Sequence, residues 1–432
     1  MILRGTLLPS RCLVAAATFC LLHAGAFAQN SQMLSLERAL QAAEAPHPDL
    51  EIALAERDLA RADQAFASAR GDLSVALEGR LQQAKPSARG SDIVSDNSLR
   101  LSARKNLFDF GRSENAVGAA RAVTEARDQD LIEARDQRRI DIMTRFFEVL
   151  LADMQAVVDG EYMTVAFLNF DRGRENFEQK LIPKVDLSEL EARFQNLFLK
   201  RNQSQQQQRL TRELLAEAMN QPGQLVSELE DPTLPGNERA LPAFEALGGL
   251  IEQSPSIQSS KKLLDASRQR LEAVRAENHP SLDAEVEANE AERRLSGRDT
   301  FRAGVVLSWP LYQGNRNASQ LAREQAQFHK LQAETEKRKR KLTQTVLTLL
   351  IEAEQLQKSA RNAAKVQVDF RDLALDRARA QYEIELRTNL GESEAATVEA
   401  KLRQRAVEYQ LALTLAKLEA LLGQPLPQPE TK

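Results

Sequence analysis

Apolar residues recur at alternating intervals of three and four positions along two long stretches of the chain, residues 112–179 and 316–385. The stripe consists of Ile140, Met143, Phe147, Leu150, Met154 and Val157 in the first stretch, and of Val346, Leu349, Ala353, Leu356, Ala360 and Ala363 in the second. This spacing is typical of coiled-coil packing. At about 1.5 Å per residue, each stretch predicts a helical rod on the order of 100 Å long.

The same spacing continues after a short break in each stretch. Loops at residues 180–185 and 386–390 separate each rod from a returning helix, so each half of the chain is predicted to form an antiparallel helical hairpin. Because a two-helix hairpin of this length buries little apolar surface, it needs neighbours to be stable. A solitary, solvated coiled coil is the alternative interpretation.

Four shorter segments alternate apolar and polar residues, which predicts strands with one apolar and one polar face. They cover residues 73–81, 99–107, 282–289 and 301–309. Their length and their charged residues on one face fit the strands of a transmembrane barrel, and a soluble strand hairpin packed on a helix is the alternative. Since the smallest such barrels need about eight strands, copies of the chain would have to associate. Two, three or four copies are all compatible with the pattern.

The chain contains this arrangement twice. The sequences Leu-Phe-Asp-Phe-Gly-Arg, ending at Arg112, and Leu-Tyr-Gln-Gly-Asn-Arg, ending at Arg316, lie 204 positions apart, and the hairpin tips that begin at Phe177 and Tyr382 lie 205 positions apart. Spacings this constant indicate a duplicated unit. We divide the chain into a signal peptide (1–28), a first repeat (29–221), an equatorial linker (222–241), a second repeat (242–424) and a proline-rich C-terminal tail (425–432).

The N-terminus has the pattern of a secretory signal peptide. Arg4 and Arg11 supply positive charge, residues 12–22 are apolar, and the small residues at 26–28 predict cleavage before Gln29. Both cysteines of the sequence lie within the first 28 residues, so the exported chain is expected to have neither a thiol nor a disulfide.

Charge and composition exclude several classes of function. Removal of Arg4 and Arg11 with the signal peptide leaves 56 basic and 62 acidic residues, a net charge of about −6, which argues against a nucleic-acid partner. The four histidines show no metal-ligand spacing, and we find neither a glycine-rich phosphate loop nor a nucleophile with a nearby base. We therefore expect no catalytic residues, no cofactor and no metal site.

Several motifs occur in a fixed order. Leu36-Glu-Arg-Ala-Leu40 is followed by Pro48-Asp-Leu50, and the two phrases ending at Arg112 and Arg316 each precede a rod and a tip. With these motifs, roughly residues 34–425 resemble the TolC family of outer membrane factors. The resemblance implies a mainly α fold with a β-barrel portion: a homotrimer whose duplicated helical hairpins form a periplasmic α-barrel, continuous with a transmembrane β-barrel of 12 strands, four per chain.

The resemblance also implies a function and partners. The protein would be a passive exit duct in the lipid of the cell outer membrane, with a large periplasmic extension, serving a tripartite efflux pump or a type I secretion system. A periplasmic adaptor (membrane fusion) protein and an inner-membrane ABC or proton-driven transporter would open it. The alternative is a periplasmic coiled-coil adaptor or scaffold, but such proteins have one helical hairpin inserted in β-rich modules, whereas this chain has two hairpins and few strands.

Residues at the tips are assigned roles by the same resemblance. Asp186 falls on an acidic position that holds the periplasmic entrance shut, and Tyr382 and Arg387 fall on its aromatic and arginine partners in the other tip. Alternatively, Asp186 caps its helix, because Asp186-Leu-Ser-Glu189 has the shape of a capping box, and Tyr382 simply packs.

The resemblance places Gly391, Glu392 and Glu394 at the lining of the aperture. Gly391 stands where the family usually has an aspartate, while Glu394 keeps the next acidic position one turn on. Lys180 and Glu385 also depart from the family, which commonly has glycine at these tip positions. Alternatively, Glu392 and Glu394 only complement the N-terminus of their helix, at about 0.3–1 kcal/mol each.

Overall fold

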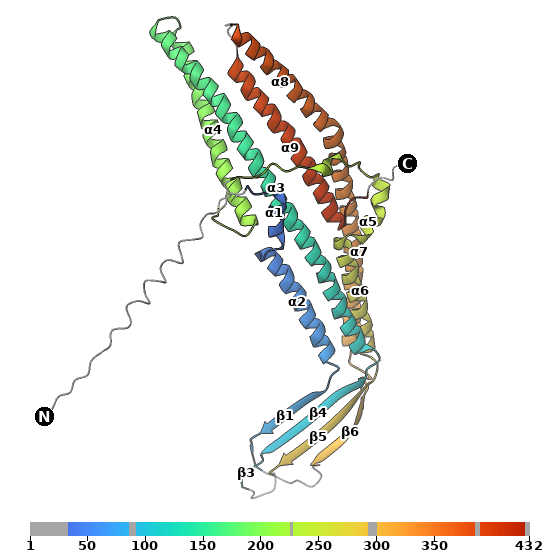
Figure 1. Cartoon of the computed structure of the whole chain (residues 1–432). Coiled ribbons are helices and arrows are strands. Elements are labelled where there is room, and N and C mark those ends of the chain that lie inside the picture. Colours follow the sequence, from blue (N-terminus) through green and yellow to red (C-terminus); the bar gives the residue numbers. More distant parts are fainter. Residues whose placement is uncertain (1–32, 86–91, 225–227, 293–299, 385–388, 428–432) are drawn as a thin grey trace, which may run out of the picture.

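The computed structural model describes residues 33–85, 92–224, 228–292, 300–384 and 389–427. The predicted signal peptide (1–28) and Arg387 lie outside these ranges. The described chain is elongated, with a β-sheet at one end and the tips of two helical hairpins at the other (Figure 1).

The first repeat contains one very long helix and three shorter ones. They are α1 (Leu36–Gln41), α2 (Pro48–Ala69), α3 (Arg112–Glu178) and α4 (Lys184–Ala218), with a 3₁₀ turn at Ala42–Glu44. Pro48 is the first residue of α2, where its missing N–H costs nothing. Helix α3 has 67 residues, or about 100 Å, and α4 packs back along it. The first predicted hairpin is confirmed.

The second repeat has matching elements, with one difference. They are α5 (Gly248–Gln253), α6 (Pro255–Ala276), α7 (Arg316–Gln355), α8 (Arg361–Glu383) and α9 (Leu390–Leu422), preceded by 3₁₀ turns at Pro235–Glu238 and Phe244–Leu247. The rod predicted over 316–385 is not one uninterrupted α-helix, because a π-helical turn at Leu356–Ala360 separates α7 from α8. The hairpin itself is confirmed, since α9 packs antiparallel on α8 and α7.

Four strands form one antiparallel sheet in the described part of the chain, as the period-two pattern predicts. They are β1 (Ser74–Arg80), β4 (Ser98–Phe108), β5 (Ser281–Ala291) and β6 (Phe301–Ser308), in the order β1-β4-β5-β6; β2 (Gln83–Ala84) and β3 (Val94–Ser95) form a separate small hairpin. The central pair, β4 and β5, comes from different repeats, with Leu101 opposite Ala288. The sheet therefore joins the two repeats side by side and leaves β1 and β6 at its edges.

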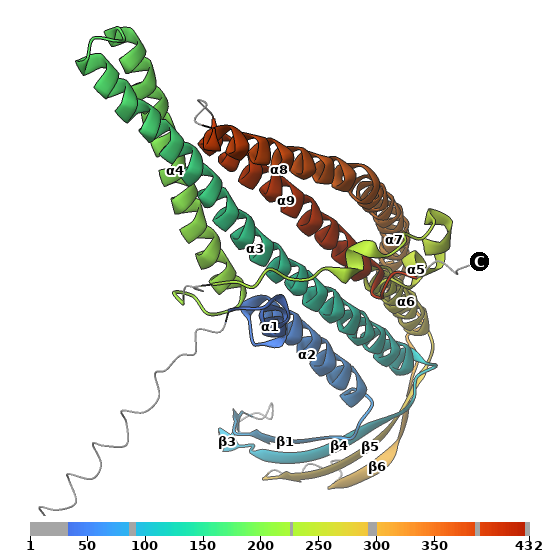
Figure 2. The ribbon, with the colours of Figure 1, turned by 45° about the horizontal axis from the view of Figure 1, so that its top comes forward.

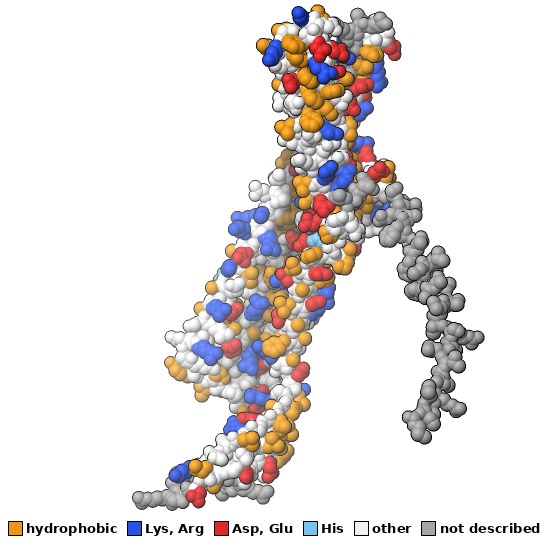
Figure 3. Space-filling model, turned by 90° about the vertical axis from the view of Figure 1, so that its left-hand side faces the viewer, with side chains coloured by type: hydrophobic (Ala, Val, Ile, Leu, Met, Phe, Trp, Pro, Cys, Tyr) orange, Lys and Arg blue, Asp and Glu red, His pale blue; other side chains and the backbone are white. Residues whose placement is uncertain are grey.

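The register separates two kinds of side chain onto opposite faces of the sheet. One face carries exposed apolar residues, namely Val75, Leu77, Leu99, Leu101, Val286, Phe301, Val305 and Leu307. The other carries cross-strand ion pairs: Arg100 Nε lies 3.1 Å from Glu287 Oε1, and Arg104 Nη2 lies 2.8 Å from Asp283 Oδ2. Figure 3 shows hydrophobic side chains gathered on the sheet near its junction with the helices.

The phrase that ends at Arg112 makes the turn from β4 into α3. Phe110 and Gly111 both have positive φ angles, 54° and 84°, and Gly111 is the N-cap of α3. Asp109, which is buried, accepts a hydrogen bond from the backbone N–H of Ser113 in the first turn. In the second repeat Gly314 has φ 64°. Each phrase thus supplies a left-handed residue that aims a long helix away from the sheet.

Two apolar clusters hold the helices together about midway along the molecule. The first includes Ile142, Phe146, Phe147, Val149 and Leu215, and the second includes Leu247, Ile257, Val346, Leu411 and Leu418. Phe147 stacks on Tyr409 with ring centroids 4.6 Å apart, which joins α3 to α9 across the repeats. The stripe is less buried toward the tips, where Val157 is 53% exposed. None of the helices in the described residues contains an apolar stretch long enough to cross a lipid bilayer.

Candidate functional site

The tips of both hairpins lie at the same end of the molecule (Figures 1 and 2). The first tip ends α3 with a Schellman motif, in which Leu181 N donates to Asn176 O at 2.8 Å and Lys180 N donates to Phe177 O at 2.9 Å. Lys180 occupies the left-handed position of this motif, with φ 60°. This conformation favours glycine, which explains why a lysine here is a departure.

Asp186 is exposed and lies in the first turn of α4, three residues after the N-cap. The N-cap is Pro183, and no side chain caps this helix. The alternative interpretation of Asp186 as a helix cap is therefore wrong, although its charge still complements the helix N-terminus. Among the described residues, its carboxylate has no ion-pair partner. Asp186 is thus available to a partner outside its own hairpin.

The second tip contributes Tyr382, which is 64% exposed near the end of α8. Asn389 is the N-cap of α9, but its side chain makes no capping hydrogen bond. The tips of the two hairpins stand apart in both views (Figures 1 and 2). Arg387, the third predicted gate residue, lies outside the described residues.

Both predicted aperture glutamates face an arginine. Glu392 Oε1 lies 3.1 Å from Nη2 of Arg193, which belongs to α4 of the first repeat. Glu394 Oε1 lies 3.9 Å from Nη2 of Arg379 on α8. The shorter pair, Arg193–Glu392, offsets the negative potential of Glu392 more strongly and links the two hairpins. The longer pair leaves more of the negative potential around Glu394.

Gly391 lies where α9 begins to pack on α3. A Cβ atom at this position would be 2.7 Å from Cγ2 of Val165. Real Cβ contacts do not come this close, so glycine permits the approach of the two helices at this point. Position 391 points toward α3 within the protomer.

Further along the hairpins, polar contacts again join the repeats. Tyr162 on α3 donates a hydrogen bond of 2.8 Å to Glu399 on α9, and Arg403 pairs with the same carboxylate. Burial acts to raise the pKa of Glu399, but the hydrogen bonds from Tyr162 and Arg403 outweigh it, so the pKa lies below its usual value. Burial, aided by the Glu399 charge, raises the pKa of Tyr162. Glu399 is therefore an ionised acceptor that clamps α9 to α3.

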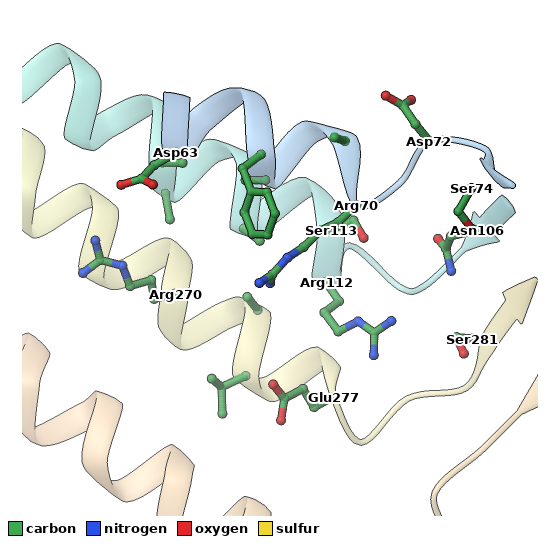
Figure 4. A pocket seen from close by; sticks show the side chains of 18 of the residues that line it. Asp63, Arg70, Asp72, Ser74, Asn106, Arg112, Ser113, Arg270, Glu277 and Ser281 are labelled. Carbon is green, nitrogen blue, oxygen red and sulfur yellow. The ribbon is translucent and has the colours of Figure 1, made fainter. Parts of the chain in front are cut away.

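A cavity of about 1110 Å³ lies at the other end of the helices, where they meet the strands. Figure 4 shows Arg70 and Arg112 extending from α2 and α3 into this space, with Glu277 reaching from the end of α6. The floor includes Arg104 and Asp283, so the cavity continues the polar face of the sheet. Within the described ranges, no group of His, Cys, Asp and Glu side chains is arranged to hold a metal ion.

Residues 246–424, nearly all of the predicted second repeat, match the model of a family described as outer membrane efflux protein. Over these residues, the second repeat of the chain matches the outer membrane efflux protein (TolC) family. The resemblance carried by the repeated motifs is confirmed. None of the curated proteins matches the sequence significantly.

Solved structures share the fold of this efflux protein over most of its length. The outer membrane protein VceC from Vibrio cholerae is 18% identical, with a TM-score of 0.74 over 91% of this chain and 97% of VceC. The CmeC outer membrane channel of Campylobacter jejuni is 14% identical, with a TM-score of 0.76 over 91% of this chain and 87% of CmeC. The MtrE outer membrane channel of Neisseria gonorrhoeae, in its open state, is 18% identical, with a TM-score of 0.73 over 92% and 91% of the two chains.

The match and the shared fold identify an efflux channel of the outer membrane with a periplasmic extension, which is a transport protein. Sequence analysis did not single out Arg193, Arg379 or Val165, although they contact the predicted aperture residues. Arg193 and Glu392 lie 199 positions apart, so no local pattern links them. The spacing of the duplicated tips is the one signal that relates these two segments.

Proposed function

We propose that three copies of this efflux protein assemble into one continuous duct, with four strands from each copy closing a 12-stranded barrel in the outer membrane. The observation that carries this proposal is a sheet with two unpaired edge strands, β1 and β6, and two faces of opposite character. An edge strand presents unpaired backbone N–H and C=O groups, which can pair with a strand of another chain. Cyclic association pairs β1 of each copy with β6 of the next.

The two faces support the placement in a membrane. The apolar face suits lipid, and the face with the pairs Arg100–Glu287 and Arg104–Asp283 suits a water-filled interior. The cavity at the junction opens on the same polar face. Three copies of this surface would form a polar passage that runs from the barrel into the helices.

The helices extend the duct into the periplasm by about 100 Å. At their far ends, we propose a closed entrance that a periplasmic adaptor and an inner-membrane transporter, either an ABC exporter or a proton-driven pump, open with their binding energy. Asp186 of one copy would pair with Tyr382 and Arg387 of a neighbouring copy, because the tips of one chain stand apart. The duct is passive and serves a tripartite efflux pump or a type I secretion system.

Assembly is tested by fractionation and electrophoresis. The full-length protein is expected with outer membranes and as a heat-sensitive, detergent-resistant trimer. Cross-linking through cysteines introduced as Ala76→Cys in β1 and Val306→Cys in β6 should join neighbouring copies, since both positions lie in edge strands. Recovery as a monomer from the soluble periplasmic fraction would overturn the proposal.

The entrance is tested by single-channel recording in planar bilayers. An exposed ion pair contributes only about 0–1 kcal/mol, but threefold repetition multiplies it. Replacing Asp186 and Arg387 by alanine should raise the conductance and the sensitivity of cells to antibiotics, with the trimer intact. Glu189→Ala, at another exposed acidic position of α4, is the matched control. A double variant that conducts like the wild type would place the closure elsewhere.

Selectivity distinguishes the two aperture glutamates. Three copies of Glu392 and Glu394 around one axis would focus negative potential, so the channel should prefer cations. Glu394→Gln should reduce this preference more than Glu392→Gln, because Arg193 already neutralises Glu392 at 3.1 Å while Arg379 lies 3.9 Å from Glu394. Reversal potentials under a salt gradient decide the question: unchanged selectivity in Glu394→Gln would mean that other residues line the aperture.

A further inference from the structure

The long rods of the two repeats differ at one place. In the second rod the π-helical turn Leu356–Ala360 interrupts the α-helix, whereas α3 is a single α-helix of 67 residues. The π-turn lies where the second rod changes direction between α7 and α8 (Figure 2). Turns of this kind are a recognised cause of bends in long helices.

The sequence accounts for this turn by one extra residue. From Arg112 to Phe177 the first repeat advances 65 positions, while from Arg316 to Tyr382 the second advances 66. One inserted residue in an α-helix would rotate everything after it by about 100°. A π-turn absorbs the residue, so Val346 before the turn and Leu375 after it are both buried, on helices that pack on α9.

A strap from the linker binds the turn directly. We define the strap as residues 231–239, which cross the helices near the bend. Nε2 of Gln357, within the turn, donates hydrogen bonds to the backbone carbonyls of Asn237 at 3.0 Å and Arg239 at 2.7 Å. Nη2 of Arg361, just after the turn, lies 2.9 Å from Oε1 of Glu238.

The same strap is anchored on α9. Asn237 is 1% exposed, and its Nδ2 donates to the backbone carbonyl of Glu408 at 2.9 Å and to Glu408 Oε2 at 2.8 Å. The Glu408 carboxylate also accepts from Nε of Arg361 at 2.6 Å. This hydrogen bond and the charge of Glu408 raise the pKa of Arg361. The bend, the strap and α9 therefore form one closed polar network.

We propose that Asn237, Gln357 and Arg361 are positioning residues for channel opening, because they hold the bend at the extra residue and thereby fix where the second tip stands. The inference rests on the proposed closed entrance. From Leu356 to Ala380 the helix runs 24 residues, or about 36 Å, so a change of 10° at the bend moves that end by roughly 6 Å. The first rod has no such turn, so the proposal concerns the position of the second tip alone.

The test measures distances between equivalent tips in the trimer. Because the sequence has no cysteine after residue 28, Ala380→Cys provides a single exposed label site on α8 of the mature chain. Double electron–electron resonance on the spin-labelled trimer should give one distance between labels in the otherwise wild-type protein. Adding Gln357→Ala should broaden this distance and lengthen it by about 6 Å or more, and should raise the single-channel conductance.

Two controls separate this effect from a general loss of stability. Tyr409→Phe removes the 2.7 Å hydrogen bond to Asp231, which also fastens the strap to α9 but does not touch the turn. The label distance should stay unchanged in this variant, and Ser188→Cys labels on α4 should report no movement in Gln357→Ala. Deleting Ser359, an exposed residue of the turn, should restore an α-helix and shift the Ala380→Cys distance without broadening it.

Unchanged label distances in Gln357→Ala, or equal changes in Tyr409→Phe, would overturn the inference while the channel itself stands. Failure of the labelled wild-type chain to form a conducting trimer would instead overturn the proposed function. Arg361→Lys, which keeps the charge facing Glu408 and Glu238, should give smaller changes than Arg361→Ala. Equal changes in both would also count against a positioning role.

Discussion

Substitution of Gly391 by alanine tests how closely the second tip depends on contact with the first rod. The new Cβ would lie 2.7 Å from Cγ2 of Val165, well inside the separation of about 3.5–4.0 Å at which carbon atoms attract. Valine is stiff at χ1, so α9 has to move away from α3. Overpacking of this kind lowers the free energy of unfolding by about 1–3 kcal/mol, and the higher helix propensity of alanine offsets about 0.5–1 kcal/mol of this loss. We expect a net loss of about 1 kcal/mol.

Native-state hydrogen exchange measures this loss where it occurs. Amide protons in the first turns of α9 should exchange about fivefold faster in Gly391→Ala than in the wild type, since 1 kcal/mol corresponds to about that factor. Gly160→Ala is the matched control: Gly160 lies within α3 with nothing within 4 Å of the new Cβ, so it should gain stability by about 0.5–1 kcal/mol.

A double-mutant cycle identifies the cause. Val165→Ala removes the clashing methyl groups, so Gly391→Ala should be neutral or stabilising in that background, with a coupling energy of about 1 kcal/mol or more. The reasoning is refuted if Gly391→Ala protects the amides of α9 in the same way that Gly160→Ala protects those of α3, or if the coupling is zero.

Three further substitutions have expected outcomes. The folded-state pKa of Glu399 lies below its usual 4.5, so the stability that Glu399 contributes is fully present above about pH 4.5 and is lost as the pH falls through the folded-state pKa. Glu399→Gln should therefore lower the urea midpoint at pH 7 and make the midpoint decline less steeply in acid. Arg138→Met removes the donor to the carbonyls of Ala42 and Ala43 and should cost about 1–3 kcal/mol in urea unfolding. Lys180→Gly removes the strain of a non-glycine residue at positive φ and should raise the free energy of unfolding, measured with urea, by up to about 1 kcal/mol.

The elements were predictable where the chain repeats a simple period. Alternation over 99–107 and 282–289 predicted β4 and β5, because a sheet with two unlike faces requires a period of two. The 3-4 stripe predicted the rods for the corresponding reason. The π-turn escaped notice because the predicted stripe was continued at 3-4 spacing through Ala363, whereas in the structure Ala363 is exposed and Ala364 is half-buried, so the buried register shifts by one residue after the turn.

The tips were harder to predict, because their contacts join distant segments. The capping-box pattern at Asp186 gave a wrong prediction of the helix cap, because Pro183, with its fixed φ, takes the N-cap position. Acidic residues at this spacing are also common in charged helices. The pair Arg193–Glu392 spans two repeats and leaves no trace in either local sequence. The direction of position 391 toward Val165 depends on how α9 docks on α3, which only the folded chain defines.

The edge strands have a consequence for the biogenesis of the protein. β1 and β6 have 7 and 8 residues, against 11 in each of the inner strands β4 and β5. A newly exported chain carries these open edges beside an apolar face while it still travels through water, and such edges template aggregation. The shortness of β1 and β6 limits that hazard but also shortens the seam between neighbours. Until the edges are paired, correct pairing between copies therefore competes with misassembly.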